Sequence, residues 1–183
     1  MYRIDHLAFR TLNRKKCIDF FCQALEYKVQ ANFDIYFNEE KTEVAECSAL
    51  EPTNKSPDAP WMTQVAIPGG TQQYVIPPEI FVSEGTPGSI VYEWAKARGG
   101  SGLHHIALQV PEDSTVEKEM EKWIKQGWAE SFSTQQPIKC DGLSQAFTRP
   151  SEITGVIFEL IQRDKHGFCK DSVKELMEST RGD

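Results

Sequence analysis

The sequence has no long hydrophobic run and no excess of positive charge. No apolar stretch approaches the roughly 18 consecutive residues that a membrane-spanning helix needs. The N-terminus lacks the apolar core of a secretory signal, because Arg3, Asp5 and Arg10 interrupt it. We therefore expect a cytoplasmic protein without a membrane partner. The net charge of −7 also argues against nucleic acid as the main partner, since phosphate recognition needs clustered lysine and arginine.

Cysteine is sparse and irregularly spaced. The chain has five cysteines, an odd number, and no two have the CxxC spacing of redox motifs and zinc sites. In a cytoplasmic protein this usage predicts reduced thiols. We assign a catalytic role to none of them.

The remaining composition is that of an ordinary globular protein. Apolar residues make up 39% and charged residues 26% of the 183 residues. This length suits one domain or two small modules packed closely together.

The first half of the chain reads as a strand, a helix and then further strands. Apolar residues recur at helical spacing over 13–25, with Asn13 as a plausible N-cap, whereas the other segments alternate as strands do. Pro68-Gly69-Gly70 marks a hairpin turn, and a short connecting helix ends at Gly99-Gly100. The predicted strands are 2–10, 29–35, 42–50, 63–67 and 74–83, and the connecting helix includes residues 90–94.

The second half repeats this order. Strands are predicted over 103–110, 143–148 and 155–162, and an amphipathic helix over 115–126. A terminal helix follows at about 170–180, with Val173, Leu176 and Met177 as its apolar stripe.

The two halves also resemble each other residue by residue. The first opens Ile4-Asp5-His6-Leu7-Ala8-Phe9, and the second Leu103-His104-His105-Ile106-Ala107-Leu108. Near their ends, Glu79-Ile80-Phe81 and Glu159-Leu160-Ile161 each place a carboxylate before apolar residues. Such similarity indicates a duplicated unit. We predict an α+β fold of two paired βαβββ modules, about 1–84 and 103–163, within a single domain spanning 1–183.

The repeat suggests a metal site. A histidine alone in a strand is usually a hydrogen-bonded core residue, and Glu159 in its apolar strand could form an ion pair with Arg163 or Arg149. If the halves pack about a pseudo-twofold axis, however, His6 and His105 converge, as do Glu79 and Glu159. Two imidazoles with a carboxylate suit a divalent metal, with Fe(II) favoured and Mn, Co, Ni or Zn possible.

Strand alternation separates the two adjacent histidines of the second half. His104 shares a face with Ile106 and Leu108, whereas His105 shares one with Ala107. We expect His105 to be the ligand and His104 to pack behind it or support it.

With these motifs the sequence resembles the vicinal oxygen chelate superfamily, whose paired βαβββ modules enclose a metal. The second half is most similar to the catalytic domain of 4-hydroxyphenylpyruvate dioxygenase. Three segments carry this likeness: Gly99 to Leu108 resembles GGxGVQHIAL, Leu143 to Pro150 resembles LLQIFTKP, and Ile157 to Arg163 followed by Gly167-Phe168 resembles FIEIIQR…GF.

The resemblance implies an Fe(II) enzyme that acts on a small oxo-acid or another oxygen-chelating molecule. His6, His105 and Glu159 would be the metal ligands, Gln145 would bind substrate, and the terminal helix would close over the pocket. The expected partner is a small-molecule substrate, with a homodimer as one possible assembly.

Three departures keep other activities open. The dioxygenase has an additional N-terminal domain, its stretch between the positions of His105 and Gln145 is longer, and it has no ligand at the place of Glu79. The related methylmalonyl-CoA epimerases and glyoxalases do have a fourth ligand there. Glu79 could therefore be a ligand and catalytic base of an isomerase or lyase that uses the metal as a Lewis acid. A resistance-type protein that binds a small molecule in the same cavity is the third possibility.

Overall fold

We describe the protein from a computed structural model covering residues 1–53, 62–75, 77–163 and 168–182. The predicted α+β class is confirmed, since these residues form four helices and two sheets, one of eight strands and one of two. The first half contains β1 (Arg3–Thr11), α1 (Arg14–Ala24), β2 (Tyr27–Tyr36), β3 (Val44–Pro52), β4 (Met62–Ile67), β5 (Gly70–Val75), β6 (Glu79–Gly85) and α2 (Ile90–Ala97). The second half contains β7 (Gly102–Gln109), α3 (Val116–Lys125), β8 (Ile138–Cys140), β9 (Leu143–Phe147), β10 (Ile157–Arg163) and α4 (Lys170–Ser179).

The large sheet has the symmetry of the sequence repeat. Its strand order is β2-β3-β6-β1-β7-β10-β9-β8, so β1 and β7 lie side by side at its centre. These two strands are antiparallel, and each has a parallel neighbour from its own half, β6 beside β1 and β10 beside β7. We call β1, α1, β2, β3 and β6 module one, and β7, α3, β8, β9 and β10 module two. A residue of one module therefore has a counterpart in the other across the β1–β7 pair.

The helices begin where the sequence predicts. Asn13 caps α1 by accepting a hydrogen bond from the Lys16 amide at 3.0 Å, and the side chain of Thr115 caps α3 in the same way. Each cap satisfies an amide that has no partner within the helix. No helix in the described ranges is long and apolar enough to cross a membrane.

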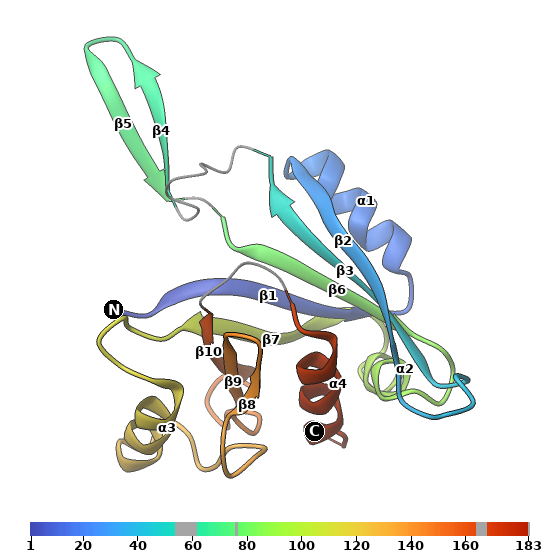
Figure 1. Cartoon of the computed structure of the whole chain (residues 1–183). Coiled ribbons are helices and arrows are strands. Elements are labelled where there is room, and N and C mark those ends of the chain that lie inside the picture. The colour runs from blue at the N-terminus through green and yellow to red at the C-terminus, as the bar shows by residue number, and fades with distance from the viewer. Residues whose placement is uncertain (54–61, 76, 164–167, 183) are drawn as a thin grey trace.

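The prolines and the hairpin alter the predicted strands. The sequence predicts a strand over 74–83 that Pro77 and Pro78 interrupt. In the structure β5 ends at Val75 and β6 begins at Glu79, because proline cannot donate to a strand ladder. The β4–β5 hairpin turns at Gly69, whose φ of +95° favours glycine, and it projects from the main sheet as a separate ribbon (Figure 1). Strand β8 has only three residues and was not predicted.

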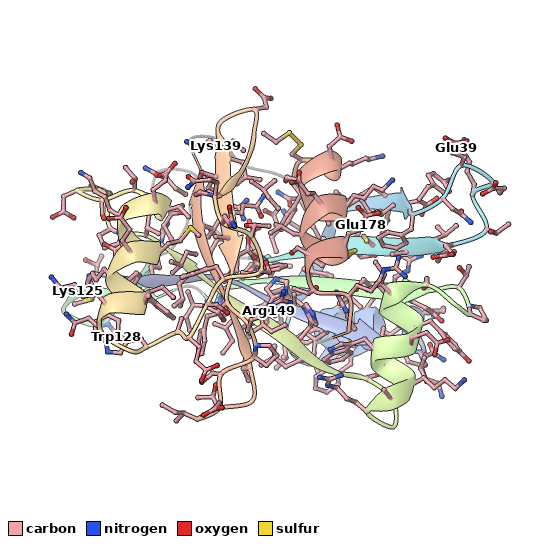
Figure 2. All side chains as sticks on the ribbon, turned by 90° about the horizontal axis from the view of Figure 1, so that it is seen from below. Glu39, Lys125, Trp128, Lys139, Arg149 and Glu178 are labelled. Atoms are coloured by element: carbon pink, nitrogen blue, oxygen red, sulfur yellow. A yellow bond between two sulfur atoms is a disulfide. The ribbon has the colours of Figure 1, made fainter. Side chains whose placement is uncertain are left out.

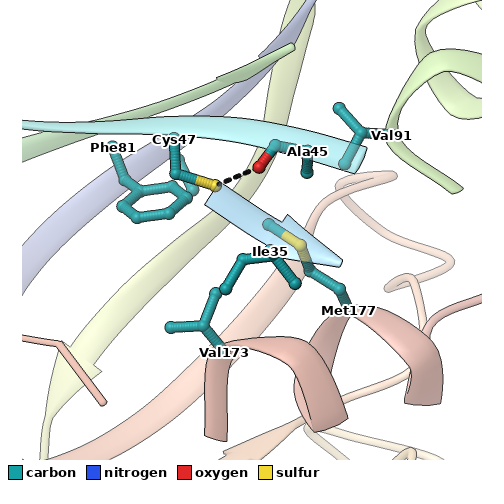
Figure 3. Close-up of a cluster of buried hydrophobic side chains, with 8 residues drawn as sticks. Ile35, Ala45, Cys47, Phe81, Val91, Val173 and Met177 are labelled. Carbon is teal, nitrogen blue, oxygen red and sulfur yellow. Dashed lines mark hydrogen bonds between the residues drawn. The ribbon is translucent and has the colours of Figure 1, made fainter. Parts of the chain in front are cut away.

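Helix α4 lies against the concave side of the sheet. It contacts β2 at one edge, β8 at the other, and α2 (Figures 1 and 2). Val173 and Met177 pack into a buried cluster with module one, together with Ile35, Cys47 and Phe81 (Figure 3). Leu176 packs on the side of module two, in a cluster with Phe147 and Ile157. The terminal helix thus joins the two modules beneath the central strands.

A disulfide attaches α4 to module two. The prediction of reduced thiols is wrong for Cys140 and Cys169, which are bonded with their Cα atoms 6.3 Å apart. The 29-residue separation carries no sequence signal, since the pairing depends on the short strand β8 lying beside the start of α4. Cys17, Cys22 and Cys47 are free thiols, as predicted.

Candidate metal centre

Three predicted ligands meet at the centre of the molecule. His6 lies on β1, His105 on β7 and Glu159 on β10, and their exposed fractions are 2%, 8% and 1%. The two Nε2 atoms are 3.2 Å apart, and Glu159 Oε2 lies 3.3 Å from His6 Nε2 and 3.1 Å from His105 Nε2. Among the described residues these three form a group that could hold a metal ion.

The spacing of the three atoms fits one ion. At a ligand distance of about 2.1 Å, two ligands at right angles lie about 3.0 Å apart, and two at the tetrahedral angle about 3.4 Å. The observed separations of 3.1–3.3 Å fall within this range. Glu159 Oε1 is buried, and no described residue forms a hydrogen bond with it. A buried carboxylate oxygen without a partner is costly, so the donor set fits a bound cation better than a closed hydrogen-bond network.

Asp5 supports His6 through an irregularity in β1. The β1–β7 register shifts between Ile4 and His6, which leaves Asp5 as the extra residue of a bulge. Its Oδ1 lies 2.8 Å from His6 Nδ1, and the same oxygen forms an ion pair with Arg163. Arg163, which the sequence offers as one alternative ion-pair partner for Glu159, pairs with Asp5. The Arg163 guanidinium also lies over the Phe168 ring. The centroids of the Phe168 and His6 rings are 5.3 Å apart.

A second bulge supports His105. The β1–β7 register shifts again between His105 and Leu103, so that His104 is the extra residue on β7. His104 Nδ1 lies 2.8 Å from His105 Nδ1. The predicted separation of the two side chains onto opposite faces is wrong, because the bulge interrupts the alternation and both line the same cavity.

The charges of the cluster act on one another. Burial by itself lowers the pKa of His6, but the charge of Glu159 and the hydrogen bond to Asp5 outweigh it and raise the pKa to about 9. Burial raises the pKa of Glu159, but the charge of His6 and the hydrogen bond with His105 bring it down to about 2. Burial dominates for His105 and lowers its pKa to about 4. Without metal, the cluster therefore holds an anionic Glu159 beside a protonated His6, and a cation could replace that proton.

The strand register places Glu79 differently from Glu159. Glu79 pairs with His6 across β6 and β1, whereas Glu159 pairs with Ala107, two residues beyond His105. The counterpart of Ala107 is Ala8, whose partner is Phe81. The predicted equivalence of Glu79 and Glu159 is therefore wrong. The residue of module one that corresponds to Glu159 is Phe81, two positions after Glu79.

Glu79 does not belong to the group of three ligands. It is half-buried at the start of β6, on the same face of the sheet as His6. Its predicted roles as fourth ligand and base stay predictions. The buried Phe81 stands in module one where Glu159 stands in module two.

A small cavity adjoins the three candidate ligands. Its volume is about 30 Å³, roughly two to three times what one water molecule needs. Gln145 on β9 lies in its wall, and Gln145 Nε2 donates a hydrogen bond of 2.8 Å to Ser172 Oγ on α4. That Gln145 binds substrate stays a prediction. Val173, Leu176 and Met177 of α4 also line the cavity.

Sequence reasoning missed Asp5 and Arg163 as supports of the site. The Asp-His dipeptide was the available signal for Asp5. Nothing in the sequence indicated that Arg163, 158 residues further on, would reach the same carboxylate.

The family profile of the Glyoxalase/Bleomycin resistance protein/Dioxygenase superfamily matches residues 3–136, more than half of the chain. The chain belongs to this superfamily. The α+β sheet with its paired modules is accordingly the vicinal oxygen chelate fold that the motifs predicted. No curated protein matches the sequence at a significant level.

Solved structures share this superfamily fold at low sequence identity. A variant of 4-hydroxymandelate synthase from Streptomyces coelicolor is 16% identical with a TM-score of 0.70, over 98% of this chain and 53% of that one. A methylmalonyl-CoA epimerase is 20% identical with a TM-score of 0.57, over 88% and 95% of the two chains. A hypothetical protein from Bacillus halodurans C-125 is 16% identical with a TM-score of 0.59, over 92% and 99%. At these identities the likeness shows the fold alone, and this chain spans about half the length of the synthase.

Proposed function

We propose that this protein is a metal-dependent, dioxygenase-like enzyme that acts on a small oxo-acid or other oxygen-chelating substrate. The observation that carries the proposal is the meeting of His6, His105 and Glu159 within 3.3 Å of one another in a buried site. Two histidines and one carboxylate on one face of an ion leave its remaining positions open, as in non-haem Fe(II) oxygenases. Fe(II) is the favoured metal, with Mn, Co, Ni or Zn as alternatives.

The metal ion and the residues around it would have different roles. A bound Fe(II) would supply Lewis acidity toward two chelating oxygens and a site for O₂. His6 and His105 would hold the ion through Nε2, and Glu159 would neutralise part of its charge. Asp5 and His104 fix the orientation of the two imidazoles at Nδ1.

The walls of the cavity determine what approaches the ion. Phe81, Phe147 and Phe168 surround the ligands with apolar surface, which excludes bulk water and strengthens the electrostatic interactions inside. Gln145 is one polar residue of the cavity wall, and its amide would orient a substrate.

Two measurements test this proposal: the metal content of the protein, and then its consumption of oxygen. Protein purified under anaerobic conditions should bind one equivalent of Fe(II), and the loaded protein should consume O₂ with one or more members of a panel of 2-oxo acids. Metal binding without oxygen consumption would reject the dioxygenase-like activity. Failure to bind any divalent metal would reject the metalloenzyme proposal altogether.

A second candidate is an epimerase-like or glyoxalase-like isomerase or lyase. It is favoured by the position of Glu79, a carboxylate next to His6 on the same face of the sheet, where a base could remove a proton from a chelated substrate. The fold shared with methylmalonyl-CoA epimerases is compatible with it. Metal-dependent exchange of substrate protons with solvent deuterium, without oxygen consumption, would favour this candidate.

A further inference from the structure

The Cys140–Cys169 disulfide lies near the surface, beside the start of α4, the helix that covers the cavity. Cys140 ends the edge strand β8, and Cys169 immediately precedes α4. Both residues are partly exposed, and Cys140 lies in an open surface cleft of about 410 Å³ beside Lys139 and Asp141. A soluble thiol could therefore reach the bond without unfolding of the protein.

Helix α4 must move before a chelating substrate can bind. The cavity volume of about 30 Å³ is roughly two to three times what one water molecule needs, whereas a 2-oxo acid has at least three carbon and three oxygen atoms. Val173, Leu176 and Met177 occupy the space opposite the ligands. Displacement of this helix is the direct way to enlarge the cavity, because the opposite wall belongs to the continuous central sheet.

The start of α4 is linked to the substrate-facing wall by a short chain of contacts. Ser172 Oγ donates to the Cys169 carbonyl at 3.1 Å and accepts the hydrogen bond from Gln145 Nε2 at 2.8 Å. Because the disulfide holds Cys169 in place, it also maintains the hydrogen bond between Gln145 and Ser172. The Gln145 amide then has this partner within the protein rather than in a substrate.

The other end of α4 has its own attachments. Ser179 Oγ pairs with Ser133 Oγ at 2.9 Å, and its carbonyl accepts a hydrogen bond from Arg149 at 3.3 Å. Thr180 accepts a long hydrogen bond from Arg10. These contacts are noncovalent and unaffected by thiol chemistry, so they would act as the pivot when the first turn is released.

We propose that the Cys140–Cys169 disulfide is a redox latch that holds α4 over the site. A dithiol reductant opens it by exchange: one thiolate attacks a sulfur of the bond, and the second thiol then resolves the mixed disulfide. Cys140 and Cys169 leave as two thiols and the reductant becomes a disulfide. The reduced protein opens its cavity more often than the oxidised protein and therefore admits substrate faster. The inference rests on the proposed function only for the identity of the ligand.

The first arm of the test needs no metal. Amide hydrogen exchange of α4 is measured in the oxidised protein and in the same protein reduced with dithiothreitol, with α3 as internal reference. We expect exchange over Lys170–Ser179 to become about tenfold faster on reduction, with Val116–Lys125 unchanged. The Cys140→Ser/Cys169→Ser double variant should show the fast rate with or without dithiothreitol. The matched control Cys17→Ser/Cys22→Ser should respond as the wild type does.

The second arm measures access. Pyruvate is mixed with Co(II)-loaded protein, and its association rate is followed by visible absorption for the oxidised wild type and the double serine variant. We expect about tenfold faster association with the variant. Equal α4 exchange in the two redox states would overturn the latch, as would α3 loosening to the same degree as α4. Failure of Fe(II), Co(II) and the other divalent metals to bind would reject the proposed function and leave the exchange result to decide the latch.

Discussion

Asp5 and His104 are counterparts in the two modules, and each holds Nδ1 of the histidine that follows it. Both contacts are 2.8 Å long, and both residues are the extra residue of a bulge in the β1–β7 pair. In a regular strand neighbouring side chains point to opposite faces, so neither contact could form. The duplicated bulge therefore fixes the orientation of both imidazoles while their Nε2 atoms face the shared centre.

Removing the Asp5 carboxylate should weaken metal binding without removing a ligand. We expect Asp5→Ala to lower Co(II) affinity by about 10–100-fold, because His6 loses the partner that orients its ring. Asp5→Asn, which keeps an acceptor oxygen, should recover part of this loss. Isothermal titration calorimetry measures the affinities, with the exposed Asp34→Ala as control. Wild-type affinity in Asp5→Ala would contradict the assigned role.

The three ligands should behave as one set. We expect His6→Ala, His105→Ala and Glu159→Ala each to reduce metal affinity by at least about 100-fold, since each removes one of three donor atoms. Metal analysis after dialysis against one equivalent of Fe(II) measures retention, and circular dichroism checks folding. Glu121→Ala on the exposed face of α3 is the control. If any of the three variants retained stoichiometric metal, that residue would not be a ligand.

A carboxylate at position 81 should complete a symmetric site. Because Phe81 is the counterpart of Glu159, Phe81→Glu would direct a second acid toward the ion. We expect the metal-free variant to be about 2–4 kcal/mol less stable in urea unfolding, with metal restoring much of the loss. Oxygen consumption should fall by more than about tenfold, since one open position is occupied. Phe81→Leu, which costs about 1 kcal/mol, should keep that activity.

Glu79→Ala separates the two candidate activities. For the dioxygenase-like enzyme we expect unchanged metal retention and oxygen consumption within about threefold of wild type, because Glu79 stands outside the group of three. An epimerase-like enzyme would instead lose proton exchange by about 100-fold or more. Glu79→Gln distinguishes loss of the base from loss of the side chain's volume.

Thiol titration should count the disulfide and identify the most protected cysteine. Burial raises the pKa of Cys47 to about 12, so only about one thiol in 10,000 is ionised at pH 8. In the native oxidised protein we therefore expect at most two thiols to react with a disulfide reagent, and to react faster as the pH rises. Unfolding should expose three thiols, and unfolding with reductant five. Five thiols without reductant would contradict the disulfide.

The sequence carried enough information to predict the candidate ligands but not the residues that support them. A repeated apolar-polar-histidine motif identified His6 and His105, and Glu159 stood out because a charge within an apolar strand needs a partner. The bulges, in contrast, depend on how β1 and β7 align, which neither strand reveals by itself. The same dependence on register explains why the sequence alone pairs Glu79, and not Phe81, with Glu159. The disulfide could not be predicted because it joins β8, an unpredicted strand of three residues, to the start of α4.

The central pair of antiparallel strands is also the seam between the two halves of the chain. His6 comes from one side of that seam, and His105 and Glu159 come from the other, so neither half alone has a complete set of donors. An ion held there would bind the joined state only and would favour it by mass action. Assembly of the two halves and loading of the metal would thus be a single coupled equilibrium.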